Sequence, residues 1–199
     1  MKWAAGLHWS YSSKAWCGFF ATLTDGRVMC RHEMTWIRTP PEQAAKELKQ
    51  FAKARNITLS SVVAQPEIFP KPSGRGETVS ETFQRAGVPM RKGDGDRLNG
   101  WSRVRSWLQP IEQANGIVGP SLLIHADCKY LLRTLPALVS STEDPDDVDE
   151  SPEEFPANGV RYYVMSRPMP NELTPSELPE GAIGHDLRAL REELASASY

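Results

Sequence analysis

The 199-residue sequence lacks the features of several protein classes. It contains no run of the roughly 20 apolar residues that a membrane-spanning helix requires, and its N-terminus has no signal-peptide pattern. Neither sign of charge dominates, because 23 Lys and Arg stand against 25 Asp and Glu, for a net charge of −2. This balance excludes a wholly basic nucleic-acid-binding protein but allows a local basic patch. We therefore expect a soluble, cytoplasmic protein with no membrane partner.

Cysteine is also scarce. The three cysteines, Cys17, Cys30 and Cys128, are an odd number, which fits a reducing compartment. No two of them have the close spacing of a zinc site. In the hairpin predicted below, Ala21 lies opposite Cys30, which puts Cys17 on the order of 13 Å from Cys30 and excludes a disulfide between them. We interpret all three as small buried apolar side chains.

A phosphate-binding loop is missing as well. The pattern Gly-x-x-x-x-Gly-Lys-Ser/Thr occurs nowhere in the chain, so we expect no nucleotide as a partner. The length suits one domain with a substantial core.

The sequence does contain clear strand signals in its first part. Runs rich in aromatic and β-branched residues predict strands at Trp3–Tyr11, Trp16–Leu23 and Arg27–Trp36. Asp25-Gly26, between the second and third strands, predicts a two-residue type I′ turn. The simplest arrangement of these three strands is an antiparallel meander.

Helices and short buried strands alternate in the rest of the chain. A helix from a Thr39 cap to about Arg55 precedes a strand at Ser61–Ala64, and a further strand is predicted at Ser121–His125. Helical crossovers place these two strands parallel within the sheet. Further helices are predicted at residues 77–86, 99–109, 127–138 (with Asp127 as its cap) and 156–166. The order predicts an α/β, ribonuclease H-like fold with a mixed five-stranded sheet (strands 1–3 antiparallel, strands 4–5 parallel) and helices on both faces.

This domain is predicted to cover residues 1–168. Residues 169–199 read as a proline-rich linker followed by a C-terminal helix at about Ile183–Ser196. Within the domain, Thr142–Glu154 holds eight acids and no base. We interpret it as a mobile, solvated loop that would repel DNA, with a lid or a DNA-mimicking contact as the alternative.

Three positions in such a fold ordinarily carry the chemistry. Carboxylates at the centre of the first strand, the end of the fourth strand and a late helix hold two divalent metals, because Mg²⁺ prefers oxygen ligands. Two such ions about 4 Å apart clamp the attacking and leaving oxygens of a phosphodiester. The corresponding residues here are His8, Gln65 and Asn158, and none of them is an acid.

Four motifs add a family resemblance to this pattern. They are Gly6–Tyr11 (Gly-Leu-His-Trp-Ser-Tyr), Ala64-Gln65-Pro66, Asp96–Trp101 (Asp-Arg-Leu-Asn-Gly-Trp) and Glu154–Tyr162. Over about residues 6–168 the chain resembles the C-terminal nuclease domain of the large terminase subunit of tailed bacteriophages. That family typically shows Gly-x-Asp-Trp-Gly-Tyr, Ala-Asp-Pro, Asp-Arg-x-x-Gly-Trp and Asp-His-x-x-Asp-x-x-Arg-Tyr. The third motif is matched in full, whereas each expected metal acid in the other three is replaced.

The resemblance implies a role in viral DNA packaging, in the host bacterial cytoplasm, where the family activity is that of a metal-dependent endodeoxyribonuclease. Because the acids are replaced, we expect a pseudoenzyme with no intact catalytic residue, no metal site and no cofactor. Such a module would bind double-stranded DNA or a phage or host protein of packaging and assembly.

Two alternatives remain open. The first is an active two-metal endonuclease that binds Mg²⁺ or Mn²⁺ through displaced acids, for which the candidates are Glu33, Glu67 and Asp127. The second is a decoy that keeps the nuclease shape in order to bind another protein. For each displaced acid, a solvated surface carboxylate or a helix cap is the competing interpretation.

A basic stretch bears on the choice between DNA and protein partners. Residues 71–105 carry eight Lys and Arg against four Asp and Glu. The candidate contacts to DNA phosphates are Arg91, Lys92, Arg97, Arg103 and Arg105. Such contacts are ionic and independent of base sequence, which suits a packaging module. The alternative is a solvated helix face.

Overall fold

The structure is a computed structural model that describes residues 2–70, 76–112, 118–149, 151 and 153–168. Six strands form one sheet in the order β5-β4-β1-β2-β3-β8. Their bounds are Lys2–His8 (β1), Lys14–Thr22 (β2), Val28–Ile37 (β3), Leu59–Ala64 (β4), Met90–Lys92 (β5) and Leu122–Ile124 (β8). A separate two-stranded sheet pairs β6 (Ile111–Glu112) with β7 (Val118–Gly119).

The topology confirms the predicted ribonuclease H-like class. Strands β1, β2 and β3 are antiparallel, while β4 is parallel to β1 and β8 is parallel to β3. The sheet has six strands rather than the predicted five, because β5, in a segment predicted as loop, pairs in parallel with β4. A three-residue strand is too short to show an alternating pattern in the sequence. The first strand also ends at His8 rather than at Tyr11.

The first hairpin differs in its turn and register from the prediction. Leu23 and Arg27 close a three-residue loop in which Gly26 alone has a positive φ, 86°, so the turn is not type I′. Ala21 therefore lies opposite Met29 rather than Cys30. A bulge at Arg31 then shifts the register by one residue along the rest of β3.

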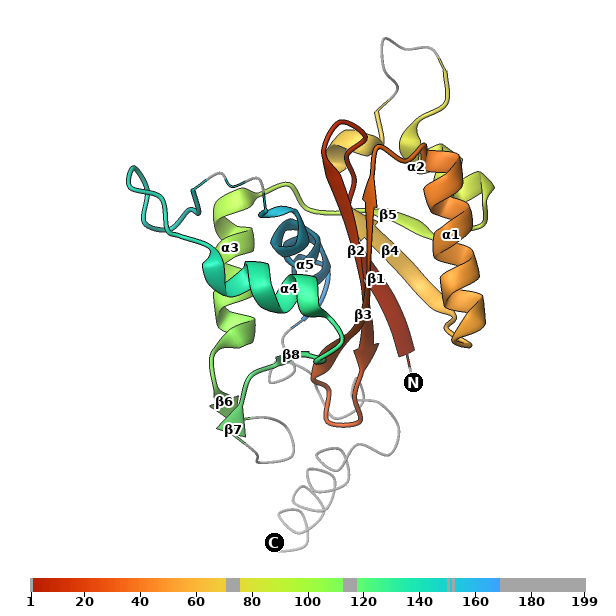
Figure 1. The fold of residues 1–199 in the computed structure, drawn as a ribbon. Coiled ribbons are helices and arrows are strands. Elements are labelled where there is room, and N and C mark those ends of the chain that lie inside the picture. The colour runs from red at the N-terminus through yellow and green to blue at the C-terminus, as the bar shows by residue number, and fades with distance from the viewer. Residues whose placement is uncertain (1, 71–75, 113–117, 150, 152, 169–199) are drawn as a thin grey trace, which may run out of the picture.

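Helices cover both faces of the sheet, as predicted (Figure 1). On one face lie α1 (Pro41–Ala54) and α2 (Val79–Arg85), and on the other lie α3 (Arg97–Leu108), α4 (Lys129–Thr134) and α5 (Phe155–Met165). Short 3₁₀ turns follow β4 (η1, Pro66–Ile68) and α4 (η3, Leu135–Ala137). None of the helices in the described part of the chain is long and apolar enough to cross a bilayer.

Each face has its own hydrophobic core. The core under α1 and α2 contains Leu7, Phe19, Leu48, Val62 and Phe83, among others. The core under α3, α4 and α5 contains Trp16, Phe20, Trp101, Trp107 and Tyr163, among others. The three cysteines are free and fully buried, as predicted, with Cys17 in the first core and Cys30 and Cys128 in the second.

Two predicted helix caps are wrong. The Thr39 hydroxyl donates to the carbonyl of Ile37, and α1 has Pro40 at its N-cap. Helix α4 begins after Cys128, and Asp127 does not cap it. The predicted linker and helix of residues 169–199 lie outside the described residues.

Candidate functional site

Strands β1 and β4 bring the first two predicted positions together. They pair in parallel with Leu7 opposite Ala64, so His8 and Gln65 leave the sheet side by side. The Gln65 amide then continues the ladder: its Oε1 accepts from the backbone N–H of Trp9 at 2.7 Å, and its Nε2 donates to the Trp9 carbonyl at 2.6 Å. Both ends of this buried amide are therefore engaged by the backbone of the neighbouring chain segment.

The third predicted position, Asn158, lies on α5, which packs unusually close to β1. A Cβ atom on Gly6 would lie 2.2 Å from the carbonyl oxygen of Gly159, so the helix and strand meet backbone to backbone. This contact places Asn158 beside the end of β1. Asn158 is 4 % exposed, and its Oδ1 accepts a 3.3 Å hydrogen bond from Nε of Arg161.

Arg161 is the charged centre of the site. It is 4 % exposed and donates to the backbone carbonyl of Asp96 at 3.1 Å and to the hydroxyl of Tyr162 at 3.2 Å. Its guanidinium also lies over the rings of Trp101 and Tyr162. Burial lowers the pKa of Arg161 and raises that of Tyr162. In the family pattern an aspartate would stand at position 158, one helical turn before this arginine, where the chain has a neutral amide.

His8 is neutral in this setting. Burial, reinforced by the positive charge of Arg161, lowers the pKa of His8 to about 4. The sequence favoured a core histidine hydrogen-bonded to a neighbour, but Nδ1 of His8 is buried and has no hydrogen-bond partner among the described residues. The histidine thus contributes neither a negative charge nor a strong cation to the site.

This depressed pKa predicts a specific loss of stability in acid. The unfolded chain binds the His8 proton below about pH 6.5, whereas the folded chain resists it down to about pH 4. Above pH 6.5 His8 therefore does not lower the free energy of unfolding. As the pH falls from there to about 4, protonation of His8 in the unfolded chain lowers that free energy progressively, by about 3 kcal/mol. Urea unfolding at pH 7 and pH 4 should show that the wild type loses this much more stability than His8→Gln.

Two outcomes separate burial from the effect of Arg161. Because burial is the larger cause, Arg161→Met should raise the pKa of His8 only part of the way back toward 6.5, as measured by NMR titration. A wild-type His8 that titrates near 6.5 would contradict this description of the site.

Of the displaced acids, Glu33 has a structural role. Its carboxylate accepts hydrogen bonds from Nε1 of Trp16 at 3.0 Å and from the backbone N–H groups of Tyr130 at 2.7 Å and Leu131 at 3.0 Å. It therefore caps the N-terminus of α4, the role that the sequence assigned to Asp127.

The other two displaced acids lie far apart. Glu67 follows β4, and Asp127 follows β8, where it pairs with Arg31 at 3.1 Å. Four inter-strand steps separate β4 from β8, which is about 19 Å across the sheet. A metal pair about 4 Å apart cannot draw on both residues. Glu33, Glu67 and Asp127 therefore do not form one site.

Charges of both signs lie around Arg161. The two carboxylates that act on Arg161 are Glu154 and Glu67, and two guanidinium groups, those of Arg161 and Arg97, lie among them. Arg97 donates to Glu154 at 3.4 Å. No group of three or more His, Cys, Asp or Glu in the described ranges could hold a metal ion. A neutral imidazole, two engaged amides and a buried arginine do not fit Mg²⁺ or Mn²⁺, which need several anionic oxygens.

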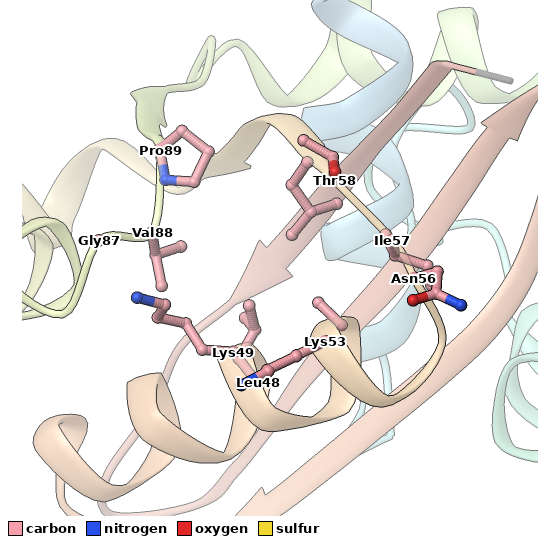
Figure 2. Close-up of a pocket in the computed structure, with 11 residues that line it drawn as sticks. Leu48, Lys49, Lys53, Asn56, Ile57, Thr58, Gly87, Val88 and Pro89 are labelled. Atoms are coloured by element: carbon pink, nitrogen blue, oxygen red, sulfur yellow. The ribbon is translucent and has the colours of Figure 1, made fainter.

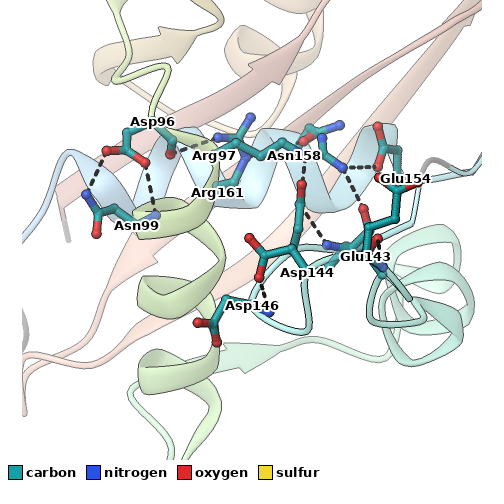
Figure 3. A network of polar contacts seen from close by, with 12 residues as sticks. Asp96, Arg97, Asn99, Glu143, Asp144, Asp146, Glu154, Asn158 and Arg161 are labelled. Atoms are coloured by element: carbon teal, nitrogen blue, oxygen red, sulfur yellow. Dashed lines mark hydrogen bonds and ion pairs between the residues drawn. The ribbon is translucent and has the colours of Figure 1, made fainter.

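The candidate phosphate contacts lie on two elements, β5 and α3, and differ in what they bind. Arg91 and Lys92 are exposed on the edge strand β5. Arg103 turns toward the end of α5 and donates to the Arg167 carbonyl at 2.8 Å. Arg97 and Arg105, in contrast, both bind the acidic stretch at residues 145–148, which lies beside α3 (Figure 3). The interpretation of this stretch as a mobile, solvated loop fits the exposed Glu143, Asp144 and Asp146 but not Asp147 and Val148, which Arg97 binds.

A pocket of about 480 Å³ lies elsewhere, on the α1 face. Leu48, Lys49 and Lys53 of α1 line one side of it, and Ile57 and Val88 are among the residues opposite (Figure 2). None of the residues predicted at the site lines this pocket.

Comparison with solved structures identifies proteins of similar fold. The chain superposes on the P22 large terminase nuclease domain with a TM-score of 0.63 at 12% identity, covering 84% of this chain and 82% of that domain. A large terminase from a thermophilic bacteriophage, solved in several crystal forms, gives 0.63 at 14% identity, covering 83% of this chain and 39% of that one. The large terminase nuclease of phage G20c, solved with bound cobalt, gives 0.54 at 7% identity, covering 82% and 80%.

The fold is that of a phage large-terminase nuclease domain. The chain spans about two fifths of the length of the large terminase solved in several crystal forms but most of the P22 and G20c nuclease domains. The sequence matches no protein-family model and no curated protein.

Sequence reasoning missed the part that Arg161 plays. It quoted Arg161 within the late-helix motif but assigned it no role, although its spacing of three residues from Asn158 puts both on one face of a helix. That spacing was the available signal.

Proposed function

We propose that the chain is a terminase-nuclease-type module that does not cleave DNA and instead binds it within phage genome packaging. The observation that carries this proposal is that His8, Gln65 and Asn158, which the family resemblance puts at the metal positions, offer a neutral imidazole and two hydrogen-bonded amides and no carboxylate. Arg161 belongs to the family pattern itself, so what distinguishes this chain is the neutral amide of Asn158, which supplies no negative charge against the guanidinium or for a divalent cation.

An active endonuclease is the weaker candidate. It needs carboxylates that converge on one point, and Glu33 is committed to α4, while Glu67 follows β4 and Asp127 follows β8, four inter-strand steps away. A protein-binding decoy is the other alternative. Exposed Arg91 and Lys92 favour a polyanionic partner over a purely protein partner.

The experiment is a gel shift on labelled duplex DNA, with Mg²⁺ present, across a series of salt concentrations. The proposal predicts a retarded complex at low salt that weakens steeply as salt rises, with the DNA still full length. The Arg91→Gln, Lys92→Gln double variant should bind more weakly and with a shallower salt dependence. Absence of binding at low salt would leave the decoy as the better account, and shortened DNA would favour the endonuclease.

A further inference from the structure

The acidic segment makes two separate contacts with α3. Arg97, at the start of the helix, donates to Asp147 at 2.7 Å, to the carbonyl of Val148 at 2.8 Å and to Glu154 at 3.4 Å. Arg105, two turns later, donates to the carbonyls of Asp146 at 3.0 Å and Pro145 at 3.3 Å, and an Asp146 carboxylate oxygen lies 3.9 Å away. Both arginines thus point into oxygens that come from one stretch of chain.

That stretch is an ordered hairpin rather than a loose loop. Ser140 and Val148 form a β-bridge, and two backbone hydrogen bonds close it, from Ser141 N–H to Asp147 and from Asp149 N–H to Val139. Residues 139–149 are called the acidic hairpin below. Arg97 holds the base of the hairpin through its ion pair with Asp147. Beyond the hairpin, Glu153 pairs with Lys14 at 2.9 Å and with Arg133.

The tip of the acidic hairpin carries carboxylates that lie at the surface. Glu143, Asp144 and Asp146 are exposed, and the Asp146 side chain is 86% exposed in its pair with Arg105 (Figure 3). Exposed ion pairs of this kind contribute about 0–1 kcal/mol, and the two exposed carbonyl hydrogen bonds of Arg105 can be exchanged for bonds to water or phosphate when the tip leaves. The contacts of Arg97, which is less exposed and meets three acceptors, hold the base in place.

The arrangement resembles what DNA would offer the same helix. Arg97 and Arg105 are eight residues apart, or about 12 Å along a helix axis. A DNA strand presents one phosphate per roughly 3.4 Å of axis, so this distance covers about three to four phosphates. Carboxylates and carbonyls at both arginines therefore occupy the places that phosphate oxygens would take.

We infer that the acidic hairpin is an intramolecular competitor of DNA for the arginines of α3, with its tip as the part that DNA displaces. This inference rests on the proposed DNA-binding function and concerns its regulation. DNA at α3 must exchange the Asp146 and Pro145 contacts of Arg105 for phosphate contacts. The hairpin thereby keeps the wild-type module in a weakly binding state until the tip is moved.

The test compares DNA binding by the wild type and by Asp144→Asn, Asp146→Asn. Asparagine at 144 keeps the oxygen that accepts from the Asp146 N–H, so the hairpin is expected to stay folded. The double variant should bind duplex DNA roughly fivefold or more tightly at low salt, and the slope of log K against log salt should steepen by about 0.9, one phosphate contact.

Two further variants make the result specific. Glu42→Gln, Glu77→Gln removes the same charge from the opposite face of the sheet and releases Arg85 of α2, which pairs with Glu77 at 2.8 Å. This control variant should bind duplex DNA less than twofold more tightly than the wild type. Adding Arg105→Gln to the tip variant should abolish the steeper slope. Thermal melts of every variant show whether each one is folded.

Three results would overturn the inference. Equal binding by the wild type and the tip variant would reject the competition while leaving DNA binding in place. An equal gain in the Glu42, Glu77 control would reduce the effect to net charge. No binding by any folded variant at low salt would reject the proposed DNA-binding function together with the inference.

Discussion

Replacing Gly6 with alanine is expected to lower the free energy of unfolding by about 3 kcal/mol or more. The new Cβ would lie 2.2 Å from the Gly159 carbonyl oxygen and 3.0 Å from Cβ of Tyr163. The nearest atom belongs to helix backbone, so relief requires α5 to move away from β1. Such a movement would open the core that contains Trp16 and Tyr163. It would also separate Asn158 and Arg161 from His8.

Gly119→Ala provides the matched control. Its Cβ would meet only the flexible end of Arg27, at 3.8 Å, and Gly119 does not have a positive φ. Urea unfolding at pH 7 should show that the free energy of unfolding of this variant stays within about 0.5 kcal/mol of the wild type. The slope of that free energy against urea concentration should be unchanged in both variants. A Gly6→Ala protein as stable as Gly119→Ala would contradict the close approach of α5 to β1.

Converting Gln65 to glutamate is expected to destabilise the protein by about 3 kcal/mol at pH 7. Glutamate keeps an oxygen that accepts from the Trp9 N–H but places a charged oxygen against the Trp9 carbonyl, 2.6 Å from the present donor. The site is buried, so water cannot take the place of the lost donor. Gln65 is thus needed for the sheet, and an acid there is not merely a restored metal ligand.

The same variant should recover stability in acid. In Gln65→Glu, the protonated carboxyl at position 65 can donate its O–H to the Trp9 carbonyl, so the folded state favours the protonated form and raises the pKa of that carboxyl. The stability deficit against the wild type is therefore full at pH 7 and shrinks as the pH falls below that raised value. Because both proteins contain His8, its acid effect cancels in the difference. A deficit that is constant from pH 7 to pH 4 would contradict the paired hydrogen bonds.

The sequence predicted the parts of the fold that depend on local pattern. Aromatic and β-branched runs located β1, β2 and β3, and the motif spacing put His8, Gln65 and Asn158 at one end of the sheet. Residue type at those positions was enough to raise the question of lost chemistry, because the ligand preference of a hard cation does not depend on tertiary detail.

What the sequence did not predict depends on partners distant in the chain. Glu33 meets the start of α4 about a hundred residues away, and Arg97 meets Asp147 fifty residues away. No local signal distinguishes such an acid from a solvated one. The bulge at Arg31, which shifts the register of β3 against β2, likewise has no local signal in the sequence.

The most direct test of the central claim is cleavage of supercoiled plasmid with Mg²⁺ and with Mn²⁺, with a phage terminase nuclease domain as the positive control. The account predicts that the wild type leaves the plasmid supercoiled and does not differ from Glu67→Gln or Glu154→Gln, because His8, Gln65, Asn158 and Arg161 supply no anionic ligand set. Nicking or linearisation that EDTA abolishes, and that either glutamine variant also abolishes, would contradict it.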